Sequence, residues 1–345
     1  MREMPARARW AVMVVTIVIL AMVIFFAAWW FSASPAEQFS TGGKIQRIIV
    51  LGTITSLTWG LLALGFTLIY GVADVLNFAH SGLYMMGAYL FYTFATIIGY
   101  HSIENPASSI LPPSIVIAVI AVSLAGVLIY LLTIHPIIED PLATLVVTVF
   151  VAMVIQQWIY LPGPIGYGGA WQIVPPVLEG SIEIFGVTVT YAKLVLVAVS
   201  LALFLFIAIF ITKTKIGSAM RAVAQDREMA MLVGINTRRL YMLTIGLSSA
   251  IAAVAGIFGP AATSGQAEPG MWLTPLAFAF SIVILGGLGS IKGTFVACLI
   301  VGYSTNAFTA LTARSFLAGP VALAIMVIVM LIRPRGIFGK RVELE

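Results

Sequence analysis

Residues 62–90 contain the densest cluster of polar side chains in an otherwise hydrophobic chain, and these side chains could bind or gate a polar solute. Asn77 offers two hydrogen-bond donors and an acceptor, His80 can donate or accept and titrates near neutral pH, and Ser81 adds a hydroxyl. Because polar groups at membrane depth are costly, they usually occur where something polar passes. We therefore predict that Asp74, Asn77, His80 and Ser81 line or gate a translocation pathway near the cytoplasmic side.

The same residues have a structural alternative. Asn77 could cap the helix that follows it, since asparagine is a preferred N-cap residue. His80 could hydrogen-bond a neighbouring span and hold it in place. Gly71 and residues 72–76 can break a helix, and a broken membrane helix is tolerated only beside protein or a watery cavity. The sequence leaves both interpretations open for each residue.

A second distinctive segment, residues 213–239, carries eight charged residues in a chain that otherwise avoids charge. Ser218 is suited to cap a helix running to about Val233, and Gly234 suits the left-handed position after its end. Thr237 can cap the following span. We predict a short helix and a tight turn on the surface, where they face water or a soluble partner.

The overall composition places both segments in a membrane protein. The chain is 61% hydrophobic and 9% charged, and its mean hydropathy is +1.08. Its apolar blocks are long enough to cross a bilayer as helices, which needs about 20 residues each. The predicted fold is all-α: a polytopic bundle of about ten transmembrane helices in a single domain, 1–345. The predicted spans are roughly 10–31, 48–70, 79–100, 114–134, 142–160, 189–212, 240–260, 273–290, 292–311 and 317–333.

The basic residues predict the orientation, because cytoplasmic loops retain Lys and Arg. With both termini in the cytoplasm, 14 of the 18 basic residues fall inside. These are Arg2, Arg7, Arg9, Lys213, Lys215, Arg221, Arg227, Arg238, Arg239, Lys292, Arg333, Arg335, Lys340 and Arg341. The net charge of +5 therefore reflects topology and anionic lipid, and predicts no nucleic-acid partner.

Two further segments complete the outline. Residues 1–47 are predicted to form an N-terminal anchor span and an outer loop, although basic residues before an apolar run also resemble a signal peptide. The outer loop 161–188 alternates around Gly186 like a small hairpin. That loop could receive an external partner or pack as a lid on its own helices.

The charged segment resembles the EAA loop of ABC importer permeases, because Glu228 and Ala230 are followed by Gly234 at that loop's spacing. In that family the loop docks on a cytoplasmic ATPase. The resemblance implies the following ATPase-coupling residues: Gln225, Asp226, Arg227, Glu228, Ala230, Gly234 and Asn236.

Three blocks in order extend the match to the LivH family, the branched-chain amino acid permeases of ABC importers. They are residues 71–89, residues 221–236 and the glycine turn 286–293. The resemblance implies a permease core at 48–345 and a cytoplasmic coupling loop at 213–239. Asp74 stands where a small residue is expected, and Lys292 stands where a proline is expected.

The resemblance also implies an assembly in the cell inner membrane. Its parts are ABC ATPase subunits that bind ATP and Mg, a second permease subunit of a different kind, and an extracytoplasmic solute-binding protein. Branched-chain amino acids are the expected substrates, and urea, short amides or other small carboxylates are the alternatives. A self-contained channel or secondary transporter is a further alternative, which should carry charged pairs deep within its spans.

Neither a nucleotide site nor a catalytic or metal site is predicted. A Walker A loop needs a glycine before a lysine and a hydroxyl residue, whereas Lys292 precedes Gly293. The three histidines lack metalloprotease spacing. The chain is thus predicted to be a transport subunit that is not an enzyme and binds no cofactor itself.

The glycines near the cytoplasmic side predict close helix packing or a hinge, since small residues let membrane helices approach. Gly289 and Gly293 have the spacing of such a contact. The full set is Gly82, Gly87, Gly286, Gly287, Gly289 and Gly293.

Overall fold

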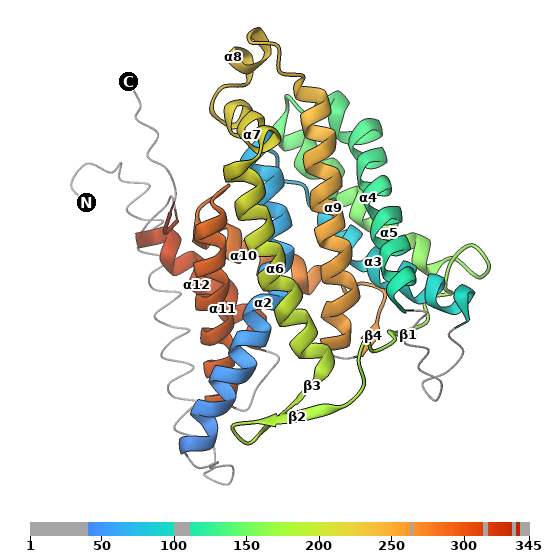
Figure 1. The fold of residues 1–345 in the computed structure, drawn as a ribbon, viewed down its shortest axis with the longest axis vertical. Helices are drawn as coiled ribbons and strands as arrows, with labels where there is room; N and C mark the ends of the chain where they lie inside the picture. The colour runs from blue at the N-terminus through green and yellow to red at the C-terminus, as the bar shows by residue number, and fades with distance from the viewer. Residues whose placement is uncertain (1–40, 100–110, 263–264, 313–316, 333–335, 339–345) are drawn as a thin grey trace, which may run out of the picture.

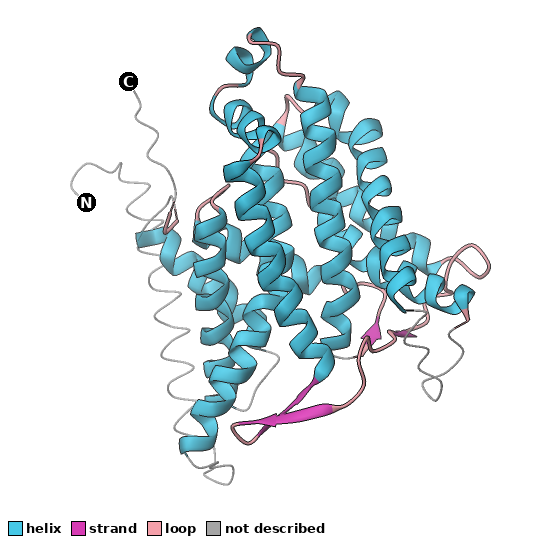
Figure 2. Ribbon diagram, viewed as in Figure 1, coloured by secondary structure: helices cyan, strands magenta, loops and turns pink. Residues whose placement is uncertain are grey.

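The computed structural model of the protein describes residues 41–99, 111–262, 265–312, 317–332 and 336–338. These residues form a bundle of long helices, and the few short strands lie at one end of it (Figures 1 and 2). The predicted all-α membrane fold is confirmed. The first predicted span, 10–31, lies outside the described residues.

The other nine predicted spans are helices. Seven are long and apolar enough to cross a membrane, and α10 and α12 are shorter apolar helices. Their bounds are α2 Thr41–Ala73, α3 Ala79–Ile98, α4 Leu111–Ile129, α5 Pro141–Tyr160, α6 Tyr191–Lys213, α9 Thr237–Ala262, α10 Leu273–Gly286, α11 Ile291–Thr312 and α12 Ala318–Ile332.

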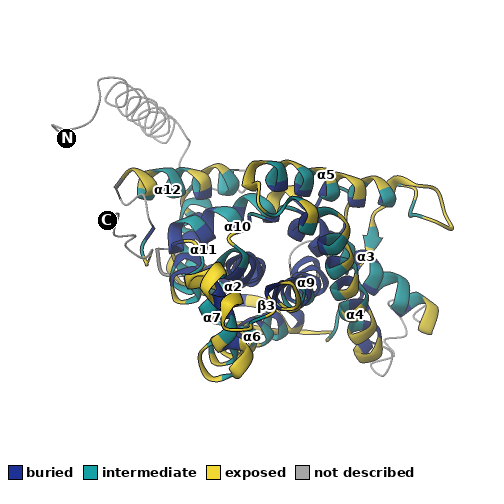
Figure 3. Ribbon diagram, turned by 90° about the horizontal axis from the view of Figure 1, so that it is seen from above, coloured by how far each residue is buried: buried dark blue, intermediate teal, exposed yellow. Residues whose placement is uncertain are grey.

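Helices α2, α3 and α9 form the centre of the bundle, and α4, α5 and α6 turn apolar faces outward (Figure 3). Close packing at the centre depends on small residues. A Cβ atom on Gly87 would lie 2.8 Å from the Ala253 Cα, and one on Gly256 would overlap the Tyr84 carbonyl. Exposed side chains such as Leu205 of α6 are suited to contact lipid, because an outward apolar face is stable only in hydrocarbon.

After Ile129, helix α4 continues as other types of helix, which the sequence did not predict. Residues Tyr130–Ile134 form a π-helix and His135–Ile137 a 3-10 turn. Asp140 then begins α5, because its carboxylate accepts hydrogen bonds from the Leu142 and Ala143 N–H groups. Such π-helical turns often occur at functional sites, and this one lies beneath the charged segment described below.

The outer loop contains the predicted hairpin, formed by β2 Ser181–Ile184 and β3 Val187–Thr190. A second pair, β1 Gln172–Ile173 and β4 Gln266–Ala267, joins this loop to the segment after α9. The charged segment forms α7 Lys215–Gln225 and α8 Arg227–Leu232 at the opposite end of the bundle from the hairpin (Figure 1). The charged segment and the outer loop therefore lie at opposite ends of the long helices.

Candidate functional site

The helix break between α2 and α3 is present, and it places Asp74 away from the other three polar residues. Helix α2 ends at Ala73, and Asp74 adopts a φ of 53°, in the left-handed region that aspartate tolerates better than most residues. The Asp74 side chain is exposed and lies within hydrogen-bonding reach of Tyr70 on the preceding turn. Asp74 therefore lies at the surface, where it ends the helix.

The capping alternative for Asn77 is confirmed. Its buried side-chain Oδ1 accepts a hydrogen bond from the Ala79 N–H at 3.1 Å, at the start of α3. The next N–H, that of Phe78, donates to Thr148 Oγ1 of α5 at 3.1 Å. Two backbone donors at the start of α3 are thus satisfied by side chains.

His80 connects three helices. Its Nε2 lies 3.2 Å from the Leu62 carbonyl oxygen of α2, and its Nδ1 lies 3.2 Å from the Ser248 hydroxyl of α9. The Ser248 hydroxyl donates to the Gly65 carbonyl oxygen at 2.9 Å. The ring fits against Gly65, where a Cβ would overlap it. His80 is wholly buried, so its structural role is confirmed.

Ser81 differs from its neighbours because its buried hydroxyl oxygen has no hydrogen-bond partner among the described residues. The structure therefore brings Asn77, His80 and Ser81 together at the start of α3, all buried within the bundle. In this conformation none of the three faces an open cavity. Their role in a translocation pathway stays a prediction that requires a second conformation.

The charged segment differs from its predicted form, because two helices replace the single one. Asp226 is extended, with φ −154° and ψ 109°, and its side chain accepts the Met229 N–H at 2.9 Å, so α7 ends and α8 begins there. The cap of α7 is Thr214, which accepts the Gly217 N–H at 2.9 Å, and Ser218 lies inside the helix. The predicted cap at Ser218 is wrong.

The end of the segment is confirmed in part. Gly234 has the predicted left-handed backbone, with a φ of 88°. The first N–H groups of α9 are capped by Asn236, whose Oδ1 accepts the Arg239 N–H at 3.0 Å. The predicted cap at Thr237 is wrong by one residue, and its buried side chain lies inside α9.

The outer face of α8 exposes an apolar tip that the sequence analysis missed. Leu232 is 80% exposed, Val233 is 78% exposed and Met229 is 61% exposed. Five consecutive apolar residues, 229–233, between Glu228 and Arg238 were the available signal. Of the predicted coupling residues, Gln225, Asp226, Glu228, Gly234 and Asn236 are exposed around this tip. An apolar centre with a polar rim is the usual composition of a protein interface.

The inner face of α8 belongs to the same buried cluster as the helix break. Ala230 is buried in a cluster with Val72 and Val75 from the end of α2 and beyond it, Tyr130 from the π-helix and Tyr241 from α9. A displacement of α8 would therefore press on the ends of three helices. Because packed interiors are stiff, the cluster can transmit such a displacement.

Arg227 reinforces that contact and faces inward more than the other charged coupling residues, Asp226 and Glu228, which are exposed. Its Nη2 lies 3.9 Å from Glu139 Oε1 in the α4–α5 connection. Its guanidinium carbon lies 5.9 Å from the centre of the Tyr241 ring, within cation–π range. Arg227 therefore joins α8 to two elements of the bundle, and part of its side chain is unavailable to a docking partner.

The glycine turn packs against the same end of α2. Gly287 and Gly289 have φ values of 98° and 78°, so Gly289 lies in a turn and not on one helix with Gly293. The predicted close approach of Gly289 is nevertheless present, because a Cβ there would lie 3.0 Å from the Gly71 Cα. Gly293 instead faces Gly286, where a Cβ would lie 2.5 Å from the Gly293 carbonyl carbon. A Cβ on Gly71 would lie 3.2 Å from Gly289.

Close packing also explains the two predicted glycines of α3. A Cβ on Gly82 would lie 3.0 Å from the Ala152 Cα of α5, and Gly87 faces α9 as described above. The packing interpretation is therefore confirmed for Gly82, Gly87, Gly286 and Gly293. A hinge at these positions stays a prediction.

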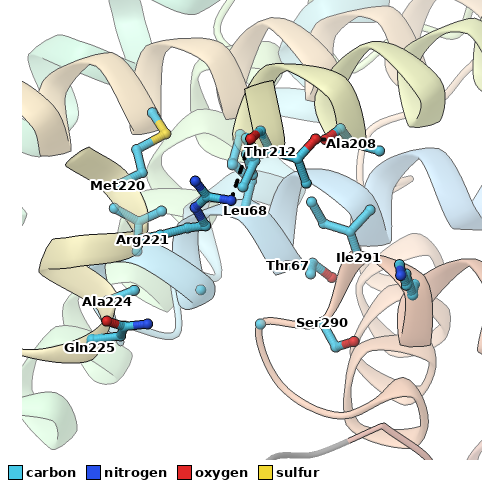
Figure 4. A pocket seen from close by; sticks show the side chains of 15 residues that line it. Thr67, Leu68, Ala208, Thr212, Met220, Arg221, Ala224, Gln225, Ser290 and Ile291 are labelled. Carbon is cyan, nitrogen blue, oxygen red and sulfur yellow. Dashed lines mark hydrogen bonds between the residues drawn. The ribbon is translucent and has the colours of Figure 1, made fainter. Parts of the chain in front are cut away.

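A cavity of about 290 Å³ lies between α2, α6, α7 and the glycine turn (Figure 4). In the close-up, Arg221 extends from α7 toward Thr212 at the end of α6, and Ser290 and Ile291 form the opposite wall. It lies beside the coupling helices and is separate from the buried start of α3. The sequence analysis did not predict this cavity.

These observations define the class of protein first: a multi-pass helical membrane protein with a short, apolar-tipped helix pair outside the bundle. Residues 48–332 match the family described as "Branched-chain amino acid transport system / permease component". The chain belongs to that family, and the family resemblance seen in the sequence is confirmed.

Two named relatives agree with this assignment over most of their length, and a third matches over a shorter segment. The chain is 27% identical over 298 residues to the high-affinity branched-chain amino acid transport system permease protein BraD of Pseudomonas aeruginosa, covering 85% of this chain and 95% of BraD. It is 29% identical over 297 residues to LivH of Escherichia coli K12, with coverages of 84% and 94%. It is 25% identical over 127 residues to LivM of the same strain, 37% of this chain and 29% of LivM. No solved structure matches the chain.

Proposed function

We propose that this chain is the permease subunit of an ABC importer for branched-chain amino acids, driven by separate ATPase subunits. The observation that carries the proposal is α8, whose outer face is apolar and exposed while its inner face belongs to the same buried cluster as the break between α2 and α3. An exposed apolar tip in water is unfavourable without a partner. In this proposal the tip occupies a groove on the ATPase.

The inner face of α8 would transmit the movement of the ATPase to the membrane helices. Closure of the ATPase would move α8, and Ala230 would press on Val75 and Tyr241. Residues 74–77 are not helical, so α2 and α3 can shift relative to each other at that point. Asn77 and Ser81 would then be exposed to solute in an inward-open state, whereas His80 would continue to join α3 to α2 and α9.

The opposite end of the bundle supports an external partner. The tip of the β2–β3 hairpin exposes Phe185 and Ile182 beside Glu183, a mixed apolar and acidic surface. Its base is anchored because Val187 and Val189 pack on Ile54 of α2. In this proposal the hairpin contacts the solute-binding protein that delivers the substrate.

The outer loop next to the hairpin is rigidly packed. The Tyr167 hydroxyl hydrogen-bonds Thr93 and donates to the Tyr89 carbonyl oxygen at 3.1 Å. Burial raises the pKa of the Tyr167 hydroxyl, so it stays protonated at neutral pH. The loop would therefore close the external end of the pathway until a binding protein docks.

The remaining parts of the assembly follow from the relatives. LivH and LivM are named as different permease proteins of a system with one name in one strain, which supports pairing with a second, different permease. ATP and Mg would be bound by the ATPase subunits and not by this chain. The assembly would lie in the cell inner membrane, with both termini of this chain in the cytoplasm, as the basic residues indicate.

The names of the relatives favour branched-chain amino acids over urea, amides or other small carboxylates as the substrate. The direct test is reconstitution of the two permeases, the ATPase and the binding protein in liposomes, with labelled leucine as solute. We expect uptake that needs ATP and every component. Uptake by this chain alone, without ATP, would contradict the proposal and favour a self-contained transporter.

A further inference from the structure

The cavity beside α7 is lined by positive charge only. Its charged lining residues are Arg221 and Lys292, and the lining includes neither aspartate nor glutamate. Two cations in one concave site, with no lining anion to offset them, attract an anionic ligand.

Arg221 is held in position for such a ligand. Its Nη2 donates to the Ser218 hydroxyl at 3.1 Å, and its Nη1 donates to the Thr212 carbonyl oxygen at 3.5 Å (Figure 4). Within the described residues, the single ion pair joins Arg227 and Glu139, so neither Arg221 nor Lys292 has an acidic partner there. A guanidinium that is oriented but not neutralised is suited to bind phosphate.

The remaining polar groups of the cavity are compatible with the same ligand. Ser290 precedes α11, and its hydroxyl accepts the Gly293 N–H at 3.1 Å. The positive end of the α11 dipole therefore adds to the charge of the two side chains. Thr67 and Thr212 supply hydroxyls to the lining.

The position of the cavity identifies the source of the anion. It lies where α6 ends at Lys213 and α11 begins at Ile291, at the end of the bundle that carries the basic residues. Along α6, the outward residues just before the cavity are apolar and exposed: Leu205 is 62% exposed and Ile209 is 50% exposed. A cationic cavity at the end of a lipid-facing apolar surface matches the shape of a phospholipid, with its headgroup in the cavity and its acyl chains along the helix.

We propose that this cavity binds the phosphate-bearing headgroup of an anionic phospholipid from the cytoplasmic leaflet. Arg221 and Lys292 contact the phosphate, and the acyl chains lie against α6. Because Met220, Ala224 and Gln225 line the same cavity, the lipid braces α7 against α2 and the glycine turn. The proposal concerns a site separate from the apolar tip of α8, so it does not depend on which solute is transported.

The test compares two charge-matched double variants of the full-length chain in detergent. R221Q/K292Q removes both cavity cations, whereas K215Q/R239Q removes two exposed cations of the same segment that do not line the cavity. Each variant is titrated with phosphatidylglycerol or phosphatidylcholine of identical acyl chains, and bound lipid is counted by native mass spectrometry. Thermal unfolding with each lipid is the second measurement.

We expect phosphatidylglycerol to bind wild type more tightly than phosphatidylcholine does, and to raise its melting temperature. R221Q/K292Q should weaken phosphatidylglycerol binding about 25-fold, or about fivefold for each cation, while K215Q/R239Q should change it less than about threefold. All four residues are exposed, so both variants should fold.

Four outcomes would overturn the proposal. Equal phosphatidylglycerol affinity for wild type and R221Q/K292Q would show that the cavity does not bind the lipid, and an equal loss in both variants would indicate diffuse surface charge. Stabilisation by inorganic phosphate equal to that by phosphatidylglycerol would assign the site to a free anion. Displacement of the lipid by an added ATPase subunit would assign the cavity to a protein interface.

Discussion

Replacing His80 distinguishes between its role as a connector of helices and a role in contacting the solute. H80L removes the hydrogen bonds to the Leu62 carbonyl oxygen and the Ser248 hydroxyl, both 3.2 Å long. A net hydrogen bond contributes about 0.5–1.5 kcal/mol, and bonds between membrane helices average about 0.6 kcal/mol. The Ser248 hydroxyl is not left unpaired, because it can still donate to the Gly65 carbonyl oxygen. We therefore expect a total loss of about 1–3 kcal/mol in the free energy of unfolding.

The assay measures unfolding and uptake on the same preparations. H80Q should lose about half as much stability as H80L, because the glutamine amide can still donate to the Leu62 carbonyl oxygen. The matched control is H135L, the same substitution at a partly exposed histidine whose ring contacts Tyr130. Uptake per folded complex should stay within about threefold of wild type in all three variants, since lost stability mainly changes abundance.

The reasoning would be refuted by the opposite pattern. If H80L retained the wild-type free energy of unfolding but lost more than tenfold in uptake per folded complex, His80 would act on the solute. If H135L destabilised the chain as much as H80L, burial and hydrogen bonding at His80 would not explain the effect.

The remaining predictions concern the ATPase contact, helix packing and coupling. L232E should abolish co-purification with the ATPase without changing the melting temperature, because Leu232 is 80% exposed, whereas L178E in the outer loop should leave co-purification intact. G286A should lower the free energy of unfolding by about 1–3 kcal/mol through overpacking, because its Cβ would lie 2.5 Å from the Gly293 carbonyl carbon. The control is G319A, which should be neutral in the same denaturation assay because nothing lies within 4 Å of its Cβ. R227Q should keep the ATPase bound and lower the solute transported per ATP hydrolysed; an unchanged ratio would show that the inward contacts of Arg227 carry no coupling.

The helices could be predicted from the sequence because each apolar run is bounded by a local signal. The start of α5 is an example, since Asp140 followed by Pro141 is a helix start in sequence and in structure. The end of α2 is another, because Gly71 and the residues after it signalled the break. Such signals act within a few residues, so tertiary structure does not override them.

The predicted helix caps and helix starts were wrong where the sequence allows two backbone conformations. Ser218 and Thr214 are both acceptable caps, and the choice depends on where α6 ends. Asp226 could lie inside a helix or begin one, and it begins α8 because its carboxylate replaces a backbone acceptor. The pairing of β1 with β4 was not predictable, because its strands are far apart in sequence and only two residues long.

The roles of the polar residues could be named but not decided from sequence. A histidine in an apolar span can face water or a neighbouring helix, and only the position of Ser248 and the absence of a side chain at Gly65 decide the case for His80. The apolar tip of α8 was missed for a related reason. In sequence, Leu232 and Val233 are indistinguishable from core residues, and their exposure depends on how far α8 extends from the bundle.

The structure joins the two segments that the sequence analysis treated separately. Val75 of the helix break and Ala230 of α8 are buried in one cluster, and that cluster is distinct from the main core around α2, α3 and α9. Helices α2 and α9 contribute to both clusters, so a displacement at the smaller cluster would pass along these helices to the main core. Asp74 lies at the edge of the smaller cluster, beside Tyr70 and near Tyr241. Its charge is therefore better placed to affect the movement of α8 than to select the solute.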